Sequence, residues 1–84
     1  MKVALRVSID DTPGLTEQLV AMFGIPVCSE YRTYWFRYTW IFDSMEEALK
    51  AEKIAQSIVG EHGSTEILGP DDNVEEEEKN EDED

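Results

Sequence analysis

Residues 27–42 read VCSEYRTYWFRYTWIF and contain seven of the eight aromatic residues of the chain. Aromatic and β-branched residues are enriched in β-strands, so this composition predicts extended structure. The stretch is also longer than a typical strand. We therefore expect a β-hairpin whose first arm covers residues 27–31 and whose turn lies near Arg32 and Thr33.

The second arm of this hairpin has two different rows of side chains, because alternate residues of a strand point to opposite faces of a sheet. One row is aromatic and consists of Tyr34, Phe36, Tyr38, Trp40 and Phe42. The other row consists of Trp35, Arg37, Thr39 and Ile41. If the aromatic row packs against helices, the mixed row lies on the open face of the sheet. The opposite parity exposes the five aromatic side chains instead.

The segment before the hairpin predicts a strand followed by a helix. Residues 3–10 alternate apolar with small or polar side chains, which is the period of a half-buried strand. The apolar positions are Val3, Leu5, Val7 and Ile9. Thr12 is a candidate helix N-cap, with Pro13 at the first helical position. Residues 15–23 then carry one apolar stripe, and Gly24 can close the helix with a left-handed cap.

The segment after the hairpin predicts a second helix and a final strand. Ser44 and Glu47 have the spacing of a capping box, and Gly60 ends the apolar pattern of the helix. A short strand over residues 65–68 follows. The order β-α-β-β-α-β predicts an α+β domain over residues 1–70. We expect a ferredoxin-like, four-stranded antiparallel sheet with both helices on one face and the first and third strands in its centre.

The acidic residues are concentrated at the end of the sequence. The 84 residues carry a formal net charge of −13. Residues 71–84 contain ten carboxylates and Lys79, which gives −9, while residues 1–70 contain ten acids and six bases, which gives −4. Residues 71–84 have too little apolar surface to fold, so we expect a disordered acidic tail. The tail either aids solubility or mimics a polyanion and binds a basic partner.

The reactive residue types do not form a catalytic or metal-binding pattern. Cys28 is the only cysteine, so no intrachain disulfide can form, and we expect its side chain to be a buried small hydrophobe. His62, the only histidine, follows Gly60 at a helix end, where it can bind free carbonyls. We therefore expect a protein that is not an enzyme, with no catalytic residue, no metal and no cofactor. The absence of a long apolar run predicts a cytoplasmic protein with no membrane partner.

The open face of the predicted sheet is the candidate surface for binding a partner, because tryptophan and arginine are enriched at binding hot spots. The predicted partner-binding residues of the domain are Arg6, Trp35, Arg37, Thr39 and Ile41. The tail contributes Glu75, Glu76, Glu77 and Glu78. It can also fold back over Arg6 and Arg37 as a salt-sensitive shield. Direct nucleic-acid binding is not expected, because a net charge of −13 repels phosphates.

The first strand, the turn Asp10-Asp11-Thr12-Pro13-Gly14-Leu15 and the apolar helix resemble the start of ACT domains, whose first strand runs into a D-x-P-G turn. This resemblance implies the ferredoxin-like plan and a dimeric sensor of a small molecule, typically an amino acid. It places the ligand near Asp11, Thr12, Gly14 and Leu15. RNA-recognition motifs share the plan, but the glycine-and-aromatic pattern of their third strand is missing from residues 35–42.

Three functions are compatible with these observations. The first, which we favour, is a regulator or inhibitor that docks on a basic protein, such as a nucleic-acid-binding protein, or that associates with itself through the sheet. The second is an ACT-like amino acid sensor that acts as a dimer. The third is an accessory subunit whose acidic tail aids solubility.

Overall fold

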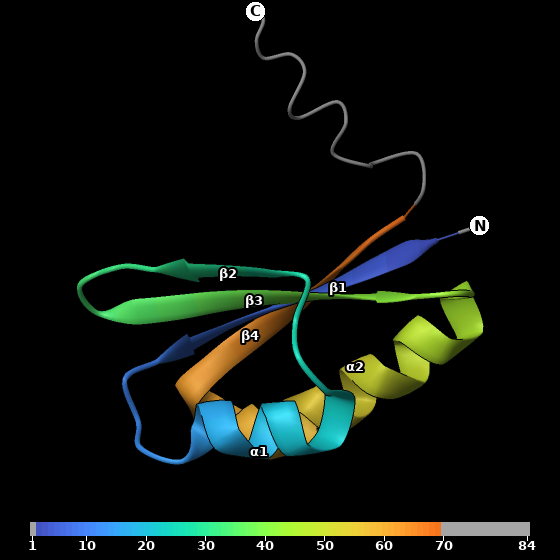
Figure 1. The fold of residues 1–84 in the computed structure, drawn as a ribbon. Helices are drawn as coiled ribbons and strands as arrows, with labels where there is room; N and C mark the ends of the chain where they lie inside the picture. The colour runs from blue at the N-terminus through green and yellow to red at the C-terminus, as the bar shows by residue number, and fades with distance from the viewer. Residues whose placement is uncertain (1, 70–84) are drawn as a thin grey trace, which may run out of the picture.

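Four antiparallel strands form a single sheet with two helices packed against it, which is an α+β fold (Figure 1). The computed structural model describes residues 2–69, so the predicted tail lies outside the described residues. In chain order the elements are β1 (Val3–Asp10), α1 (Leu15–Phe23), β2 (Cys28–Tyr31), β3 (Trp35–Phe42), α2 (Met45–Val59), the short 3-10 helix η1 (Gly60–His62) and β4 (Gly63–Leu68). The strand order across the sheet is β2-β3-β1-β4.

The strand register decides which side chains share a face. β1 and β3 pair along their whole lengths, from Val3 opposite Phe42 to Asp10 opposite Trp35. β4 pairs with the other side of β1, and β2 pairs with the outer side of β3. β1 and β3 therefore lie in the centre, and β2 and β4 are the two edges of the sheet.

Both helices lie against the same face of the sheet (Figure 1). The odd-numbered residues of β1 are buried beneath them, and small residues of α2 allow the helix to approach the sheet closely. The buried core consists of Val3, Leu5, Val7, Ile9, Leu15, Leu19, Tyr38, Trp40, Ala48, Ala51, Ala55 and Val59. Of the two parities that the sequence allows for β3, the structure has the one that buries the aromatic row. Tyr34 is the exception, because it lies in the hairpin turn before β3 and is 79% exposed.

The two helices begin differently. Ser44 caps α2, and its side chain accepts a hydrogen bond from the Glu47 N–H at 3.2 Å, as the capping box predicts. The prediction for α1 is wrong, because the N-cap is Gly14, at φ +91°, with no side-chain cap. The Thr12 hydroxyl instead donates to a carboxylate oxygen of Asp10. The side chain that was expected to cap the helix is thus held by β1.

Buried polar contacts attach α1 and the segment after it to the sheet. Trp40 Nε1 donates to the Gly24 carbonyl at 2.8 Å, just after the end of α1. Gly24 ends the helix as predicted and donates its own N–H to the Val20 carbonyl at 2.8 Å, but its φ of +87° and ψ of −167° are not those of the expected left-handed cap; the positive φ still favours glycine. Neither helix among residues 2–69 has the length and hydrophobicity required to cross a membrane.

Candidate protein-binding surface

The face of the sheet opposite the helices is left uncovered by residues 2–69 (Figure 1). Pairing of β1 with β3 brings the predicted partner-binding residues of the domain together on this face. Arg6 lies opposite Thr39, and Ile41 and Trp35 lie near the two ends of the same strand pair. Ile41 is exposed, while the other members are half-buried. We refer to these residues, Arg6, Trp35, Arg37, Thr39 and Ile41, as the open face.

Both arginines of the open face are paired with carboxylates from the edge strands. Arg6 Nη1 lies 3.4 Å from a Glu66 oxygen on β4, and Arg37 Nη1 lies 3.2 Å from a Glu30 oxygen on β2. Such partly exposed pairs contribute little to stability, but they cancel local charge. Sequence reasoning did not identify Glu30 or Glu66, because their contacts depend on cross-strand register rather than on any local pattern.

Trp35 forms a second feature of the open face, at the hairpin end of β3. The Arg37 Cζ atom lies 4.9 Å from the centre of the Trp35 ring, and the Arg32 Cζ atom lies 5.5 Å from it. A guanidinium group over an indole ring is a favourable cation–π contact. The Nε atom of Arg37 is buried and has no hydrogen-bond partner within the described residues. Two cationic neighbours therefore contact the indole ring on the open face.

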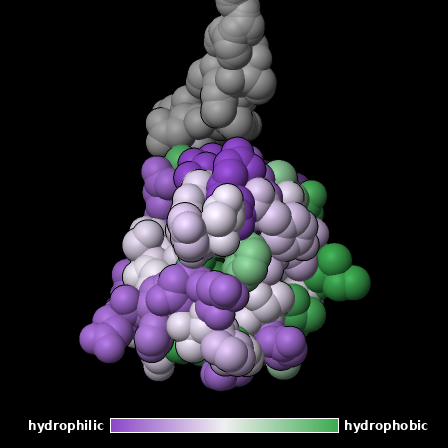
Figure 2. All heavy atoms as spheres, turned by 90° about the vertical axis from the view of Figure 1, so that its left-hand side faces the viewer, coloured by the Kyte–Doolittle hydropathy of each residue, from purple (hydrophilic) through white to green (hydrophobic). Residues whose placement is uncertain are grey.

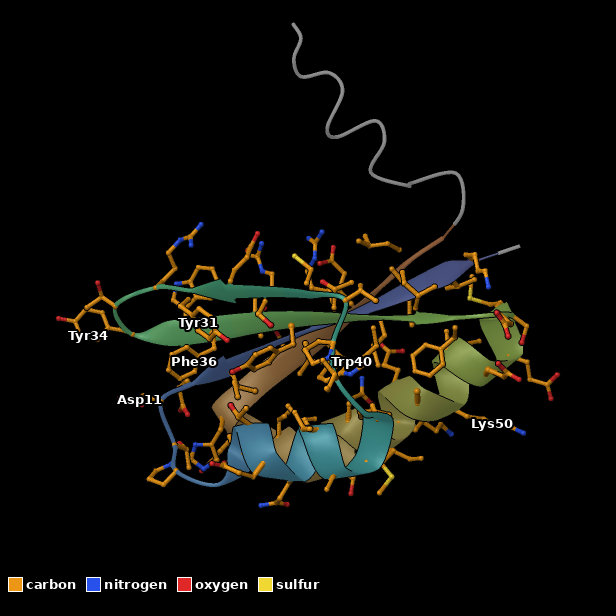
Figure 3. The ribbon with its side chains drawn as sticks, viewed as in Figure 1. Asp11, Tyr31, Tyr34, Phe36, Trp40 and Lys50 are labelled. Atoms are coloured by element: carbon orange, nitrogen blue, oxygen red, sulfur yellow. The ribbon has the colours of Figure 1, made fainter. Side chains whose placement is uncertain are left out.

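A group of exposed apolar side chains follows the edge strand β2 and the segments on either side of it. We call this group the β2 margin, and its members are Met22 (53% exposed), Ile25 (85%), Val27 (66%), Tyr31 (63%) and Tyr34 (79%). Figure 3 shows Tyr34 projecting from the tip of the hairpin. Viewed from the hairpin end, the molecule carries hydrophobic surface on one flank (Figure 2). Sequence reasoning missed the margin, although aliphatic residues on both sides of Pro26, outside any helical period, were a usable signal.

Cys28 is exposed, so the prediction of a buried small hydrophobe is wrong. It lies opposite Thr39 and therefore on the uncovered side of the sheet. A position in a short edge strand, facing away from the helices, has a neighbouring strand on one side only and no described helix to bury it. Its exposure follows from topology rather than from residue type.

His62 contacts side chains of the β1–α1 loop rather than the helix carbonyls that the sequence predicts. Its Nδ1 atom lies 3.1 Å from an Asp10 oxygen and 3.1 Å from the Thr12 hydroxyl oxygen. The hydrogen bond from Thr12, aided by the one shared with His62, lowers the pKa of Asp10. Since a single ring nitrogen faces both partners, the three residues do not form a relay in which histidine connects a nucleophile to a carboxylate.

The residues that the ACT resemblance selects lie in and beside this same loop. Asp11 and Gly14 are exposed, and Thr12 is half-buried (Figure 3 labels Asp11). Leu15 is 5% exposed and packs in the core cluster. The loop therefore offers polar and backbone groups to solvent, while its apolar member faces the interior.

Within residues 2–69, no group of three or more histidine, cysteine or acidic side chains is arranged to hold a metal ion. The predicted contact residues Glu75, Glu76, Glu77 and Glu78 lie outside the described residues. Comparison with known protein families and with characterised proteins finds no match for this chain. The surface is therefore interpreted from its own chemistry.

Proposed function

We propose that this chain is a non-enzymatic regulator, built on the ferredoxin-like plan, that docks on a basic protein partner through the open face and the adjoining β2 margin. The observation that carries this proposal is Trp35, placed between Arg32 and Arg37 on a face that no described helix covers. A large side chain that is already ordered loses little conformational entropy on binding, which is a property of hot-spot residues.

Electrostatics favour a basic partner. The net charge of −13 attracts a positively charged surface over a long range and accelerates encounter. Arg6 and Arg37 would oppose such a partner if they were unpaired, but Glu66 and Glu30 neutralise them within the sheet. Carboxylates can also replace phosphates as pairing groups for lysine and arginine, so the partner's basic site is one that can hold a polyanion.

The test is affinity capture from cell extract with the full chain as bait and two matched variants. Trp35→Ala removes the indole of the open face, and Leu49→Ala removes an exposed apolar side chain from the outer side of α2, on the other side of the molecule from the open face. A true partner is retained by the Leu49→Ala bait and reduced at least about tenfold with the Trp35→Ala bait, which corresponds to roughly 1.4 kcal/mol of binding free energy.

The captured protein is then purified and its affinity is measured at low and at physiological salt. Binding should weaken steeply as salt is added, because screening removes long-range attraction between exposed charges. Equal capture by both variants, or an affinity that does not respond to salt, contradicts the proposal. Circular dichroism of each variant confirms that the comparison is made between folded proteins.

A further inference from the structure

The outer edge of the sheet at β2 presents backbone groups that have no partner strand. The Arg32 N–H donates to the Trp35 carbonyl at 2.9 Å, so these two residues form a hydrogen-bonded pair beside the turn. Hydrogen-bonded and non-hydrogen-bonded pairs alternate along an antiparallel ladder. Glu30 therefore directs its backbone groups toward β3, and Ser29 and Tyr31 direct theirs away from the sheet.

Of these outward-facing backbone groups, only one makes a hydrogen bond within residues 2–69. The Tyr31 carbonyl accepts a hydrogen bond from Arg32 Nη1 at 3.1 Å. The N–H groups of Ser29 and Tyr31 and the carbonyl of Ser29 remain free to pair with an incoming strand. An exposed strand edge of this kind is a ready template for another extended chain.

The β2 margin gives this edge an apolar border, and the border is already ordered. Tyr31 packs edge-on against Phe36 and Tyr38, with ring centroids 5.7 and 6.3 Å apart. Figure 3 shows Tyr31 beside Phe36. The hydrogen bond from Trp40 to Gly24 holds the segment that leads to Ile25 and Val27. Ordering these groups before binding lowers the entropic cost of association.

The other edge of the sheet differs in chemistry. None of the exposed large hydrophobic residues among residues 2–69 belongs to β4. The Thr65 hydroxyl in this strand is bound to Glu52 at 2.9 Å and to Gln56 at 3.1 Å, both from α2. The two edges are therefore not equivalent, and only β2 combines free backbone groups with an apolar border.

Charge selects the occupant of this edge. A second copy of the chain brings its own net charge of −13, which repels the first, whereas a basic segment is attracted by that charge. At the edge itself Glu30 is paired with Arg37, and Arg32, which donates to the Tyr31 carbonyl, adds a positive charge. The preference for a basic occupant therefore rests on the net charge of the whole chain. The chain leaves the sheet at Leu68 on β4, three inter-strand spacings from β2, or roughly 14 Å. This distance exceeds the Debye length of about 8 Å at physiological salt, so screening weakens the attraction exerted at the β2 edge by acidic residues close to Leu68 in the sequence, and the preference for a basic segment is strongest at low salt.

We infer that β2 binds an extended segment of a protein partner by strand addition, and that this segment alternates apolar with lysine or arginine residues. The inference rests on the proposed function and specifies its binding mode. Apolar side chains of the incoming segment pack beside Tyr31, Val27 and Ile25, and its backbone pairs with Ser29 and Tyr31. Basic side chains on its other face lie toward Glu30.

The experiment uses the full chain and a short, amidated peptide of alternating lysine and valine. Backbone amide exchange is followed by NMR. With peptide at about ten times its Kd, exchange at Ser29 and Tyr31 should slow about tenfold, while exchange along β4 stays unchanged. The same peptide with N-methylated valines keeps the charge but lacks the valine N–H donors, and its N-methyl groups obstruct the close approach of two strands, so it should give no protection.

Two variants at one position provide a matched control. Ser29→Pro removes an outward N–H without removing a bond between β2 and β3, and it should abolish protection by the peptide. Ser29→Ala keeps the N–H and should retain protection. If Ser29→Pro does not fold, the N-methylated peptide tests the same hydrogen bonds on the unaltered chain.

Several results overturn the inference. Equal protection by the N-methylated peptide, or no slowing of exchange at Ser29 and Tyr31, excludes strand addition. If light scattering of the free chain gives about twice the monomer mass of 9.6 kDa and exchange at Ser29 is already slow, a second copy occupies the edge. A failed peptide experiment together with capture that still depends on Trp35 refutes the binding mode alone, whereas loss of both refutes the proposed function.

Discussion

Replacing Trp40 by phenylalanine tests how the aromatic row of β3 holds the fold together. Trp40 is 3% exposed, packs against the rings of Phe23 and Tyr38, and donates its indole N–H to the Gly24 carbonyl at 2.8 Å. Trp40→Phe keeps an aromatic ring but removes the donor and part of the ring volume. The change therefore creates a small cavity and leaves a partly buried carbonyl without its partner.

The cost can be assembled from these two losses. The unpaired Gly24 carbonyl costs about 1 kcal/mol. A volume loss of roughly 35–40 Å³ at about 24 cal/mol per Å³ adds about 1 kcal/mol, and the lost apolar burial adds up to another ~1 kcal/mol. The sum is about 2–3 kcal/mol. A domain of this size has a free energy of unfolding of roughly 3–10 kcal/mol, so Trp40→Phe removes a large share of it.

Urea unfolding followed by far-UV circular dichroism measures the effect, and the other tryptophan supplies the control. Trp40→Phe should lower the midpoint by about 2 M with an unchanged m value near 1 kcal/mol per M, and should lower Tm by roughly 10–20 °C. Trp35 is half-buried, and no hydrogen bond from its indole is formed within residues 2–69, so Trp35→Phe should cost less than about 1 kcal/mol. If the two variants are equally destabilised, the assigned role of the Trp40–Gly24 hydrogen bond is incorrect.

Three further substitutions test other parts of the fold. Gly63→Ala should destabilise the domain by about 2–3 kcal/mol in the same urea assay, because an added Cβ meets the Ser8 carbonyl oxygen across the β1–β4 ladder. A loss of stability below about 0.5 kcal/mol would contradict this close approach. Asp10→Asn should lower the unfolding midpoint at pH 7. The hydrogen bond from Thr12 lowers the folded-state pKa of Asp10, so the carboxylate stabilises the fold fully above its unfolded-state pKa of about 3.9. This stabilisation disappears as the pH falls through the folded-state pKa. The difference between wild type and Asp10→Asn should therefore vanish in acid, and a difference that persists there would exclude the carboxylate as its source. Ser44→Ala should cost about 1 kcal/mol and increase amide exchange in the first turn of α2, whereas unchanged exchange would show that the cap is dispensable.

Local sequence patterns were sufficient for most of the secondary structure. The alternation of Val3, Leu5, Val7 and Ile9 identified β1 and its buried face, because a strand has a two-residue period that each residue reports independently of the rest of the chain. Ser44 with Glu47 located the start of α2 for the same reason, since a capping box is completed within four residues. Parity grouped the aromatic residues of β3 into one row but left open whether that row faces the core, and the structure shows that it does, except for Tyr34 at the turn.

Features that depend on contacts between distant segments were outside the reach of these patterns. Thr12 has the sequence context of an N-cap, but Asp10 and His62 hold its hydroxyl across the β1–α1 loop. Cys28 is of a residue type that is usually buried, but the edge position of β2 exposes it. For Thr12 the contacts come from Asp10, two residues away, and from the distant His62, and for Cys28 the absence of a covering element determined the outcome.

The candidate surface likewise combines features that local sequence patterns predict with features that only the tertiary structure shows. Periodicity was enough to place Trp35 and Arg37 on the same side of one strand, and the structure showed that this side is the one opposite the helices. Only the tertiary structure showed that Glu30 and Glu66 neutralise the arginines, and that the β2 edge carries free backbone groups with an apolar border. Periodicity determines which side of a strand a residue takes, whereas cross-strand register and strand order determine its neighbours. Register and strand order are settled by packing of the whole domain.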